Sequence, residues 1–455
     1  MIWSRRQFAG LTLGFAAWPG LVSAQDSGLE DALLAQLFGT TSEHEAGLRL
    51  IADRGKPDMA AGLILALRFA INRQDAIGRT LERLTGQSHG TQWFDWMLWQ
   101  ERNPQIVPHP SYAAFMRDAH LRIDPNFRDF LRPEHLTRDA AKIRIEEIAW
   151  GGVLKDGIPS LDTPTMITAS SAEYLRDDDL VFGISINGDA RAYPLRIMGW
   201  HEMFNDVVGG VPVALAYCTL CGSGILFETQ TRNAKKPLIF GSSGFLYRSN
   251  KLMFDRKTNS LWNQYTGQPV IGPLAGRGIK LTQRPVVITT WANWKATHPT
   301  TRVLSLKTGY RRDYGSGVVY SAYFGSPDLM FPALVDEQAH NQKDYVFTIR
   351  QFGVARAWPL NAFDKKRVIN DAIANTPLVL IGNAQTRSVR AYERGDLTFA
   401  STGDRLTASD GTGWTATEAA LVGPDGVSLS RVAGHISYWF AWDNYIGDAG
   451  TVYPG

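Results

Sequence analysis

Two stretches of the chain read almost alike, and this internal repeat constrains the fold more than any other feature. The sequence VFGISINGDARAYPL begins at Val181, and VFTIRQFGVARAWPL begins at Val346, 165 positions later and without a gap. The same offset aligns one Asn-Asp pair with another. We therefore expect two copies of one unit, roughly 145–305 and 330–450, packed together as a pair.

The pattern of apolar and polar residues changes near residue 143. Residues 26–140 place apolar side chains at spacings of three and four, which predicts helices. Helical hairpins in series are typical of a HEAT-like bundle. Later segments alternate β-branched and aromatic runs with Gly, Asn, Asp and Pro clusters, which indicates strands and turns. The predicted fold class is α+β, with an N-terminal α-helical, HEAT-like domain followed by a duplicated β-rich module.

The N-terminus has the features of an export signal. Arg5 and Arg6 precede a mild apolar run that ends in small side chains, which predicts cleavage after Ala24. The Ser-Arg-Arg-x-Phe string resembles a twin-arginine signal, although a general secretory signal with adjacent arginines would look similar. We expect residues 1–24 to direct export through the twin-arginine pathway, to the periplasm or another exported location.

Charge and hydropathy narrow the classes of partner. Lys and Arg number 47 against 44 Asp and Glu, so the formal net charge is +3. This balance provides no basic field for nucleic acid. Beyond the first 25 residues the sequence has no apolar run of about 18, so no transmembrane span is expected in the mature chain. The expected partner is an unknown periplasmic protein or a small substrate.

The chain has two cysteines, Cys218 and Cys221, in the stretch YCTLCG. The preceding VPVALAY is typical of a strand, and CTLCGSG of a turn whose glycines can adopt a positive φ. Thiols in an oxidising periplasm pair with each other unless something else occupies them. A disulfide across so short a ring stabilises little, so we expect these cysteines to carry chemistry.

Comparison of the two repeats separates structural residues from candidate functional ones. Residues present in both copies, such as Arg191, Asn205 and Asp206, are expected to serve the fold. The positions that do not recur are Cys218, Cys221, His201 and Glu202, which become Asn383, Thr386, Lys366 and Arg367 in the second copy. Random drift gives the same pattern, but joint loss is typical of an inactive copy of a single site. We therefore predict one site, in the first copy.

The stretches GWHEMFNDVVGGVPVALAYCTLCGS and LYRSNKLMFDRKTNSLWNQYTGQPVIGPLAG resemble the signature of the domain-of-unknown-function 3179 family of exported bacterial and archaeal proteins. The resemblance covers roughly 145–445. The family more often has Pro at the position of Thr219 and Thr at that of Ala216, and neither change removes a candidate ligand. The resemblance implies an exported setting and brings no established activity.

A metal site is the first interpretation of this constellation. Two thiolates of Cys218 and Cys221 with the imidazole of His201 suit copper or zinc, with a fourth position open for chemistry. A closed four-cysteine zinc site is excluded, because the chain has no other cysteine. Glu202 would orient the imidazole or act as a catalytic base. Arg248 has no clear counterpart in the second repeat, so we predict that it faces the site as a second catalytic residue.

Two other classes remain open, and the sequence does not establish whether the protein is an enzyme. In a thiol–disulfide redox protein, one of Cys218 and Cys221 attacks, the other resolves, and His201 lowers a thiol pKa. In a non-catalytic periplasmic binding or assembly protein, the helical domain recruits a partner.

Overall fold

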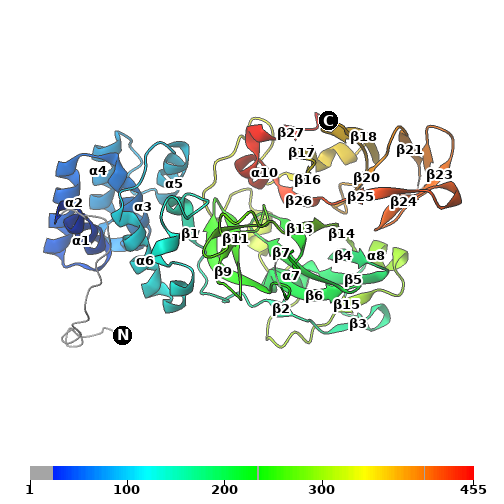
Figure 1. The fold of residues 1–455 in the computed structure, drawn as a ribbon, viewed down its shortest axis with the longest axis horizontal. Helices are drawn as coiled ribbons and strands as arrows, with labels where there is room; N and C mark the ends of the chain where they lie inside the picture. Colours follow the sequence, from blue (N-terminus) through cyan, green and yellow to red (C-terminus); the bar gives the residue numbers. More distant parts are fainter. Residues whose placement is uncertain (1–23, 233–234, 404, 455) are drawn as a thin grey trace.

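The computed structural model describes residues 24–232, 235–403 and 405–454. Helices occupy one end of the molecule and two β-rich regions, one above the other, occupy the other end (Figure 1). The predicted α+β class is confirmed, with a helical N-terminal region followed by a β-rich one. The predicted export signal lies outside the described residues, except for Ala24 at the start of the first helix.

The helical region contains six α-helices in the described part of the chain. They are α1 (Ala24–Phe38), α2 (Thr41–Arg54), α3 (Ala60–Phe69), α4 (Gln74–Thr85), α5 (Trp93–Arg102) and α6 (Ser111–Ile123). A capping box of Thr40 and Glu43 starts α2, and Gly55 ends it with φ 64°. None of the described helices is long and apolar enough to cross a membrane.

The first β-rich region is built from three sheets of five strands. In spatial order, one sheet contains β1 (Ile148–Trp150), β9 (Phe240–Tyr247), β10 (Asn250–Asp255), β11 (Leu261–Asn263) and β12 (Gln268–Ile271). The next contains β13 (Thr282–Arg284), β8 (Ser223–Glu228), β7 (Val211–Cys218), β6 (Met203–Val208) and β2 (Leu161–Asp162). The third contains β14 (Val287–Thr290), β4 (Leu180–Ile186), β5 (Asp189–Pro194), β15 (Arg302–Leu304) and β3 (Met166–Thr168). Its helices are α7 (Leu195–His201) and α8 (Trp291–Thr297).

The second β-rich region contains a sheet of four strands and a sheet of eight. The smaller sheet contains β26 (His435–Tyr438), β16 (Tyr345–Gln351), β17 (Val354–Pro359) and β27 (Thr451–Val452). The larger contains β18 (Val368–Ile373), β19 (Thr376–Asn383), β20 (Ser388–Glu393), β25 (Ser428–Val432), β24 (Ala420–Val422), β23 (Gly413–Ala416), β22 (Arg405–Ala408) and β21 (Phe399–Thr402). Its helices are α10 (Trp439–Tyr445) and three 3-10 helices, η8 (Leu360–Phe363), η9 (Pro424–Gly426) and η10 (Gly447–Ala449).

The strands of the two regions follow the same spatial order. The order β14-β4-β5-β15 matches β26-β16-β17-β27, and β13-β8-β7-β6 matches β25-β20-β19-β18. Each of the strands β4 to β8 starts 165 positions before its counterpart in β16 to β20. The shared offset in the sequence therefore corresponds to a shared arrangement of strands.

Residues that recur in both repeats make the same contacts. The side chain of Asn205 bonds the backbone N–H and C=O of Phe240, and Asn370 does the same to Phe399. Likewise, an arginine pairs with an aspartate in each region, in Arg191–Asp206 and in Arg356–Asp371. These contacts tie strands of one region together, so the recurring residues serve the fold.

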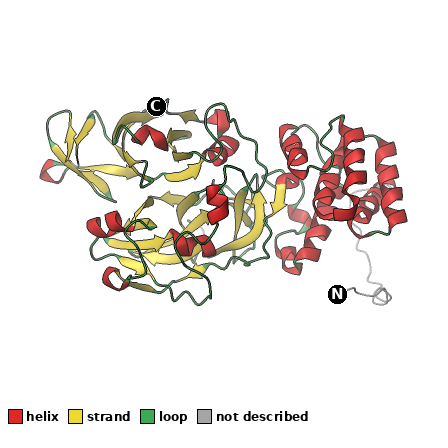
Figure 2. Ribbon diagram, turned by 180° about the vertical axis from the view of Figure 1, so that it is seen from behind, coloured by secondary structure: helices red, strands yellow, loops and turns green. Residues whose placement is uncertain are grey.

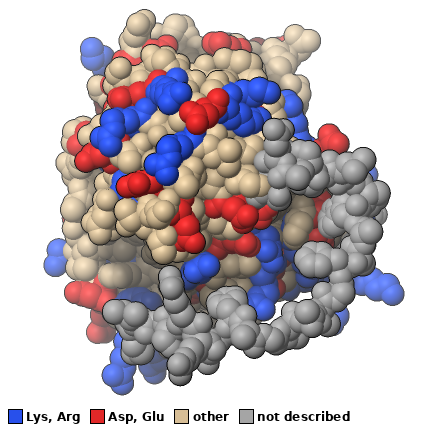
Figure 3. Space-filling model, turned by 90° about the vertical axis from the view of Figure 1, so that its left-hand side faces the viewer, with Lys and Arg blue, Asp and Glu red and all other residues tan. Residues whose placement is uncertain are grey.

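The two β-rich regions share a core. Buried side chains of the first, such as Phe182 and Leu215, lie in one cluster with Phe347 and Leu380 of the second. Figure 2 shows the two β-rich regions from behind, with the strands of one region next to those of the other. Figure 3 shows basic and acidic side chains interspersed on the helical end, in keeping with the small net charge.

Candidate functional site

The two cysteines lie at the turn between β7 and β8. Cys218 ends β7 and pairs with Ser223 at the start of β8. The backbone N–H of Cys221 donates to the carbonyl of Cys218 at 3.2 Å, and Gly222 follows with φ 59°. This is the strand and turn expected from the sequence, with glycine where the left-handed conformation needs it.

Both thiols are free and buried, with 2% of Cys218 and 0% of Cys221 exposed to solvent. They lie within hydrogen-bonding reach of each other, and the Cys221 Sγ donates to the carbonyl oxygen of Ser249 at 3.4 Å. Burial raises the pKa of the Cys221 thiol well above its usual value, and Cys218 and Glu202 raise it further. Cys221 is therefore held as a protonated thiol at neutral pH.

Glu202 lies beside the cysteine turn and forms a buried ion pair. It follows the last residue of α7 with φ 53°, a left-handed position that turns its side chain away from the helix. Its Oε2 accepts from the Nζ of Lys251 at 3.0 Å, and its Oε1 accepts from the Thr219 hydroxyl at 2.7 Å. The carboxylate and ammonium are thus desolvated together, with one hydrogen bond running directly to the turn that carries the thiols.

Thr219 has a specific role in this arrangement. It lies between the cysteines at the second position of the turn, where proline is also well accommodated. Its hydroxyl supplies the hydrogen bond to Glu202, which a proline there would lack. Threonine at this position therefore supplies a polar contact where proline would supply a stiffer backbone.

His201 lies on the other side of this helix end. A carbonyl can only accept, so the Nδ1–H donates to the Pro159 oxygen at 2.9 Å. The Nε2 then accepts from the hydroxyl of Tyr314 at 2.6 Å. Burial lowers the pKa of this imidazole, which keeps it neutral. Both ring nitrogens are engaged away from the sulfurs, so His201 is not poised as a third ligand.

Arg248 also points away from the thiols. Its guanidinium pairs with Glu147 at 2.5 Å and lies 3.6 Å from Glu101 of α5. It also donates to the backbone carbonyl of Asn444 in α10. Arg248 therefore joins the helical region to both β-rich regions, and it reaches the site only through its neighbour Ser249, whose carbonyl accepts from Cys221.

The residues brought together at the site are thus Cys218, Cys221 and Glu202. Among the described residues, no group of three or more His, Cys, Asp or Glu side chains is arranged to hold a metal ion. The sequence interpretation missed Lys251, although a single lysine in the apolar run KLMF was a signal for a buried partner. It also missed the tyrosines that surround the turn, because they come from distant segments.

Three polar atoms beside the site lack partners. The side-chain Nδ2 and Oδ1 of Asn250 and the hydroxyl of Ser249 are buried without a hydrogen bond among the described residues. Ser249 also has a positive φ of 62°. Buried polar groups are nearly always paired, so these atoms are a source of instability or a contact surface for a small polar group.

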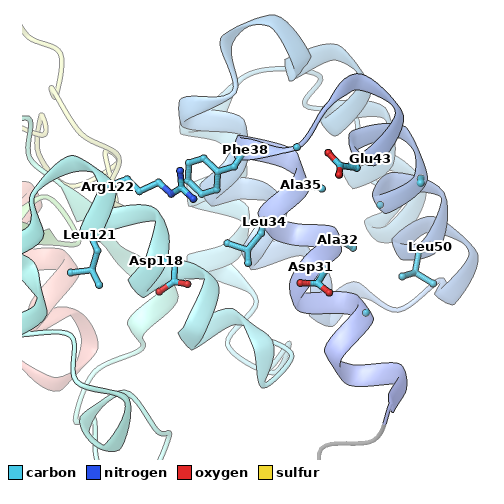
Figure 4. Close-up of a pocket in the computed structure, with 14 residues that line it drawn as sticks. Asp31, Ala32, Leu34, Ala35, Phe38, Glu43, Leu50, Asp118, Leu121 and Arg122 are labelled. Carbon is cyan, nitrogen blue, oxygen red and sulfur yellow. The ribbon is translucent and has the colours of Figure 1, made fainter. Parts of the chain in front are cut away.

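A cavity of about 800 Å³ lies elsewhere, in the helical region. It is lined by side chains of α1, α2 and α6, including Asp31, Glu43 and Asp118. Arg122 covers one end of it, with its guanidinium carbon 3.7 Å from the centre of the Phe38 ring (Figure 4). None of the predicted site residues lines this cavity.

Comparison with known proteins gives one family and no characterised relative. The model of a family described as "Protein of unknown function (DUF3179)" matches residues 155–449. The match includes the cysteine turn and both β-rich regions apart from β1 and β27, and it starts after the helical region. No curated protein and no solved structure matches the chain. The chain therefore belongs to the DUF3179 family.

Proposed function

We propose that Cys218 and Cys221 form a thiol–disulfide redox centre. The observation that carries the proposal is the pair of free, buried thiols next to a buried carboxylate, Glu202, that is paired with Lys251. Two sulfurs within reach of each other can close a disulfide with little movement of the chain.

The reaction follows from which thiol is held protonated. Cys221 keeps its proton, so the first attack is assigned to the Cys218 thiolate, which displaces one thiolate from a substrate disulfide and forms a mixed disulfide. The Cys221 sulfur then attacks Cys218 and releases the second substrate thiolate. The two protons lost by the cysteines end on the two substrate thiols.

The alternative is a metal site of the two sulfurs. Zinc prefers four ligands, and the imidazole expected to be the third is engaged by Pro159 and Tyr314. The soft thiolates favour copper(I) over zinc. The raised pKa of Cys221 means that binding a metal would have to release the proton of this thiol.

The wider setting supports redox chemistry. We propose export through a twin-arginine signal to the periplasm, where thiols exchange with disulfides. We also propose that the β-rich regions are two copies of one unit, supported by their matching strand order and the paired Asn205 and Asn370 contacts. The helical region would then be a separate HEAT-like domain that recruits a partner.

The test is a redox titration of the purified mature protein. It is equilibrated in glutathione buffers of graded potential, quenched in acid and alkylated, and the disulfide is quantified by mass spectrometry. We expect one reversible two-electron transition that Cys218→Ser and Cys221→Ser each abolish. Elemental analysis of the same sample addresses the alternative. A protein that never forms the disulfide and holds one metal ion per chain would overturn the redox proposal.

A further inference from the structure

The segment that links the two β-rich regions lies over the cysteine turn. We call residues 305–344 the strap; it runs from the end of β15 to the start of β16 and contributes no strand to any sheet. Its one α-helix, α9 (Ser321–Gly325), is a short turn. A segment without ladder hydrogen bonds depends on side-chain contacts for its position.

Two tyrosines of the strap contact the site directly. The hydroxyl of Tyr323 donates to the carbonyl of Leu220, between the two cysteines, at 2.7 Å. Tyr323 shares the buried cluster of Cys218 and Cys221. The hydroxyl of Tyr320 reaches the Glu202 carboxylate at 3.3 Å. The strap therefore forms part of the wall that excludes solvent from the thiols.

A third tyrosine of the strap contacts His201. Tyr314 of the strap donates to the Nε2 of His201 and is itself within 2.7 Å of the Thr308 hydroxyl. The imidazole thus holds the strap at the same helix end that positions Glu202.

The middle of the strap is held by hydrogen bonds to side chains of α7 and by one tight contact. Its Val319 packs on Gly199 of α7 so closely that a Cβ at Gly199 would lie 2.5 Å from the Val319 Cγ1. On its outer side, Val318, Phe324 and Met330 are 40%, 40% and 47% exposed. The strap buries its tyrosines on one side and leaves other large apolar side chains in solvent on the other, and no strand pairing holds its middle in place.

We infer that the strap is a gate that controls access to the Cys218–Cys221 thiols. In the closed state described above, a substrate disulfide cannot reach either sulfur, because both are buried. Opening breaks the contacts of Asp313, Tyr314, Ser316, Tyr320 and Tyr323 and leaves the β7–β8 turn in place. The strap limits access to the thiols whatever their chemistry, and only its role in catalysis rests on the redox function proposed above.

The test measures how fast iodoacetamide alkylates the cysteines of the native, reduced protein. Gly199→Ala places a methyl group against Val319 and should speed alkylation about fivefold, as should Tyr323→Phe, which loses one hydrogen bond. Val319→Ala combined with Gly199→Ala should bring the rate back toward wild type. Gly325→Ala is the matched control, since a Cβ there meets nothing within 4 Å, and it should leave the rate unchanged.

Two further measurements separate gating from other causes. The rate is followed from about pH 7 to about pH 10, because an opened gate multiplies the rate at every pH, whereas an altered thiol pKa moves the profile. Urea unfolding shows whether a faster rate merely tracks lost global stability. Rates within about twofold of wild type in both single variants, or increases that track global stability, would overturn the gate. Alkylation does not require disulfide chemistry, so failure of the redox titration leaves this result interpretable.

Discussion

The Nζ of Lys251 lies 3.0 Å from the Oε2 of Glu202, and both side chains are buried. Lys251 comes from β10 and Glu202 from the end of α7, so the ion pair joins two sheets behind the cysteine turn. The carboxylate also raises the pKa of Cys221. The behaviour of the thiols is therefore coupled to the protonation and pairing of this carboxylate.

Removing the charge of Glu202 should lower the pKa of Cys221. In Glu202→Gln the amide keeps the shape of the side chain but no longer repels a thiolate, so the thiolate forms at lower pH. The pH profile of thiol alkylation measures this shift. Glu418→Gln is the control, because Glu418 is a buried carboxylate paired with Arg390 and Arg431 in the second β-rich region. An unchanged or raised pKa in Glu202→Gln would contradict the assignment.

Removing one partner of the Glu202–Lys251 ion pair should lower the free energy of unfolding more than removing both charges together. Lys251→Met leaves a buried carboxylate without its cation, and such a loss typically costs about 3–5 kcal/mol of the free energy of unfolding. Adding Glu202→Gln removes the unpaired charge, so the double variant should lose less than the sum of the two single losses. Urea denaturation of the four proteins gives this coupling energy. Additive losses would show that the pair does not interact.

Stability should fall at alkaline pH because of Cys221. A thiol whose pKa is higher in the folded chain than in the unfolded chain stabilises the fold fully below the unfolded value of about 8.5. That contribution is lost as the pH rises through the folded pKa, which burial has raised. Cys221→Ser cannot ionise in this range, so under reducing conditions its stability should depend less on pH above about 8.5. Equal slopes for the two proteins would refute this expectation.

Substitutions of Thr219 compare two contributions to stability, the hydrogen bond from its hydroxyl to Glu202 and the stiffness that a proline would give the turn. Thr219→Val removes the hydrogen bond to the Glu202 carboxylate and should cost about 1.5–3 kcal/mol, as expected for a hydrogen bond to a charged group. Thr219→Pro loses the same bond but restricts the unfolded chain, so it should be less destabilising than Thr219→Val by about 0.4–1 kcal/mol. Thermal or urea unfolding compares the two. A proline variant less stable than the valine variant would show that the turn does not accept proline.

Asn250 should be a site where a substitution stabilises the protein. Its two side-chain polar atoms are buried and unpaired, so Asn250→Leu should raise the free energy of unfolding by about 1–3 kcal/mol. Asn205→Leu is the matched control, because both amide atoms of Asn205 are bonded to Phe240, and it should destabilise the protein. If Asn250 holds a small polar substrate, Asn250→Leu should also slow the redox reaction. Destabilisation by Asn250→Leu would mean that the amide is paired in solution.

The β-rich part could be anticipated because its signals are local and repeated. The strand VPVALAY and the turn CTLCGSG appear as β7 and the β7–β8 turn, since alternation and glycines act over a few residues. The direction of His201 could not be anticipated. It ends a helix and is followed by a left-handed Glu202, so two neighbours in sequence point to different places. Lys251 and Tyr323 reach the site from segments distant in the sequence, and contacts of that kind produce no periodic pattern of residues that could be recognised.

The backbone N–H of Tyr438 in β26 donates to the carbonyl of Cys221 at 2.8 Å. A region without cysteines thus completes the surroundings of the thiols in the other region. Gly222 is pressed between Tyr345 and Tyr438, whose rings would lie 3.2 Å from any Cβ placed there. A fragment that stops before residue 345 would lose both tyrosines and uncover the turn that carries the thiols, so the dithiol stays shielded only when the two regions fold together.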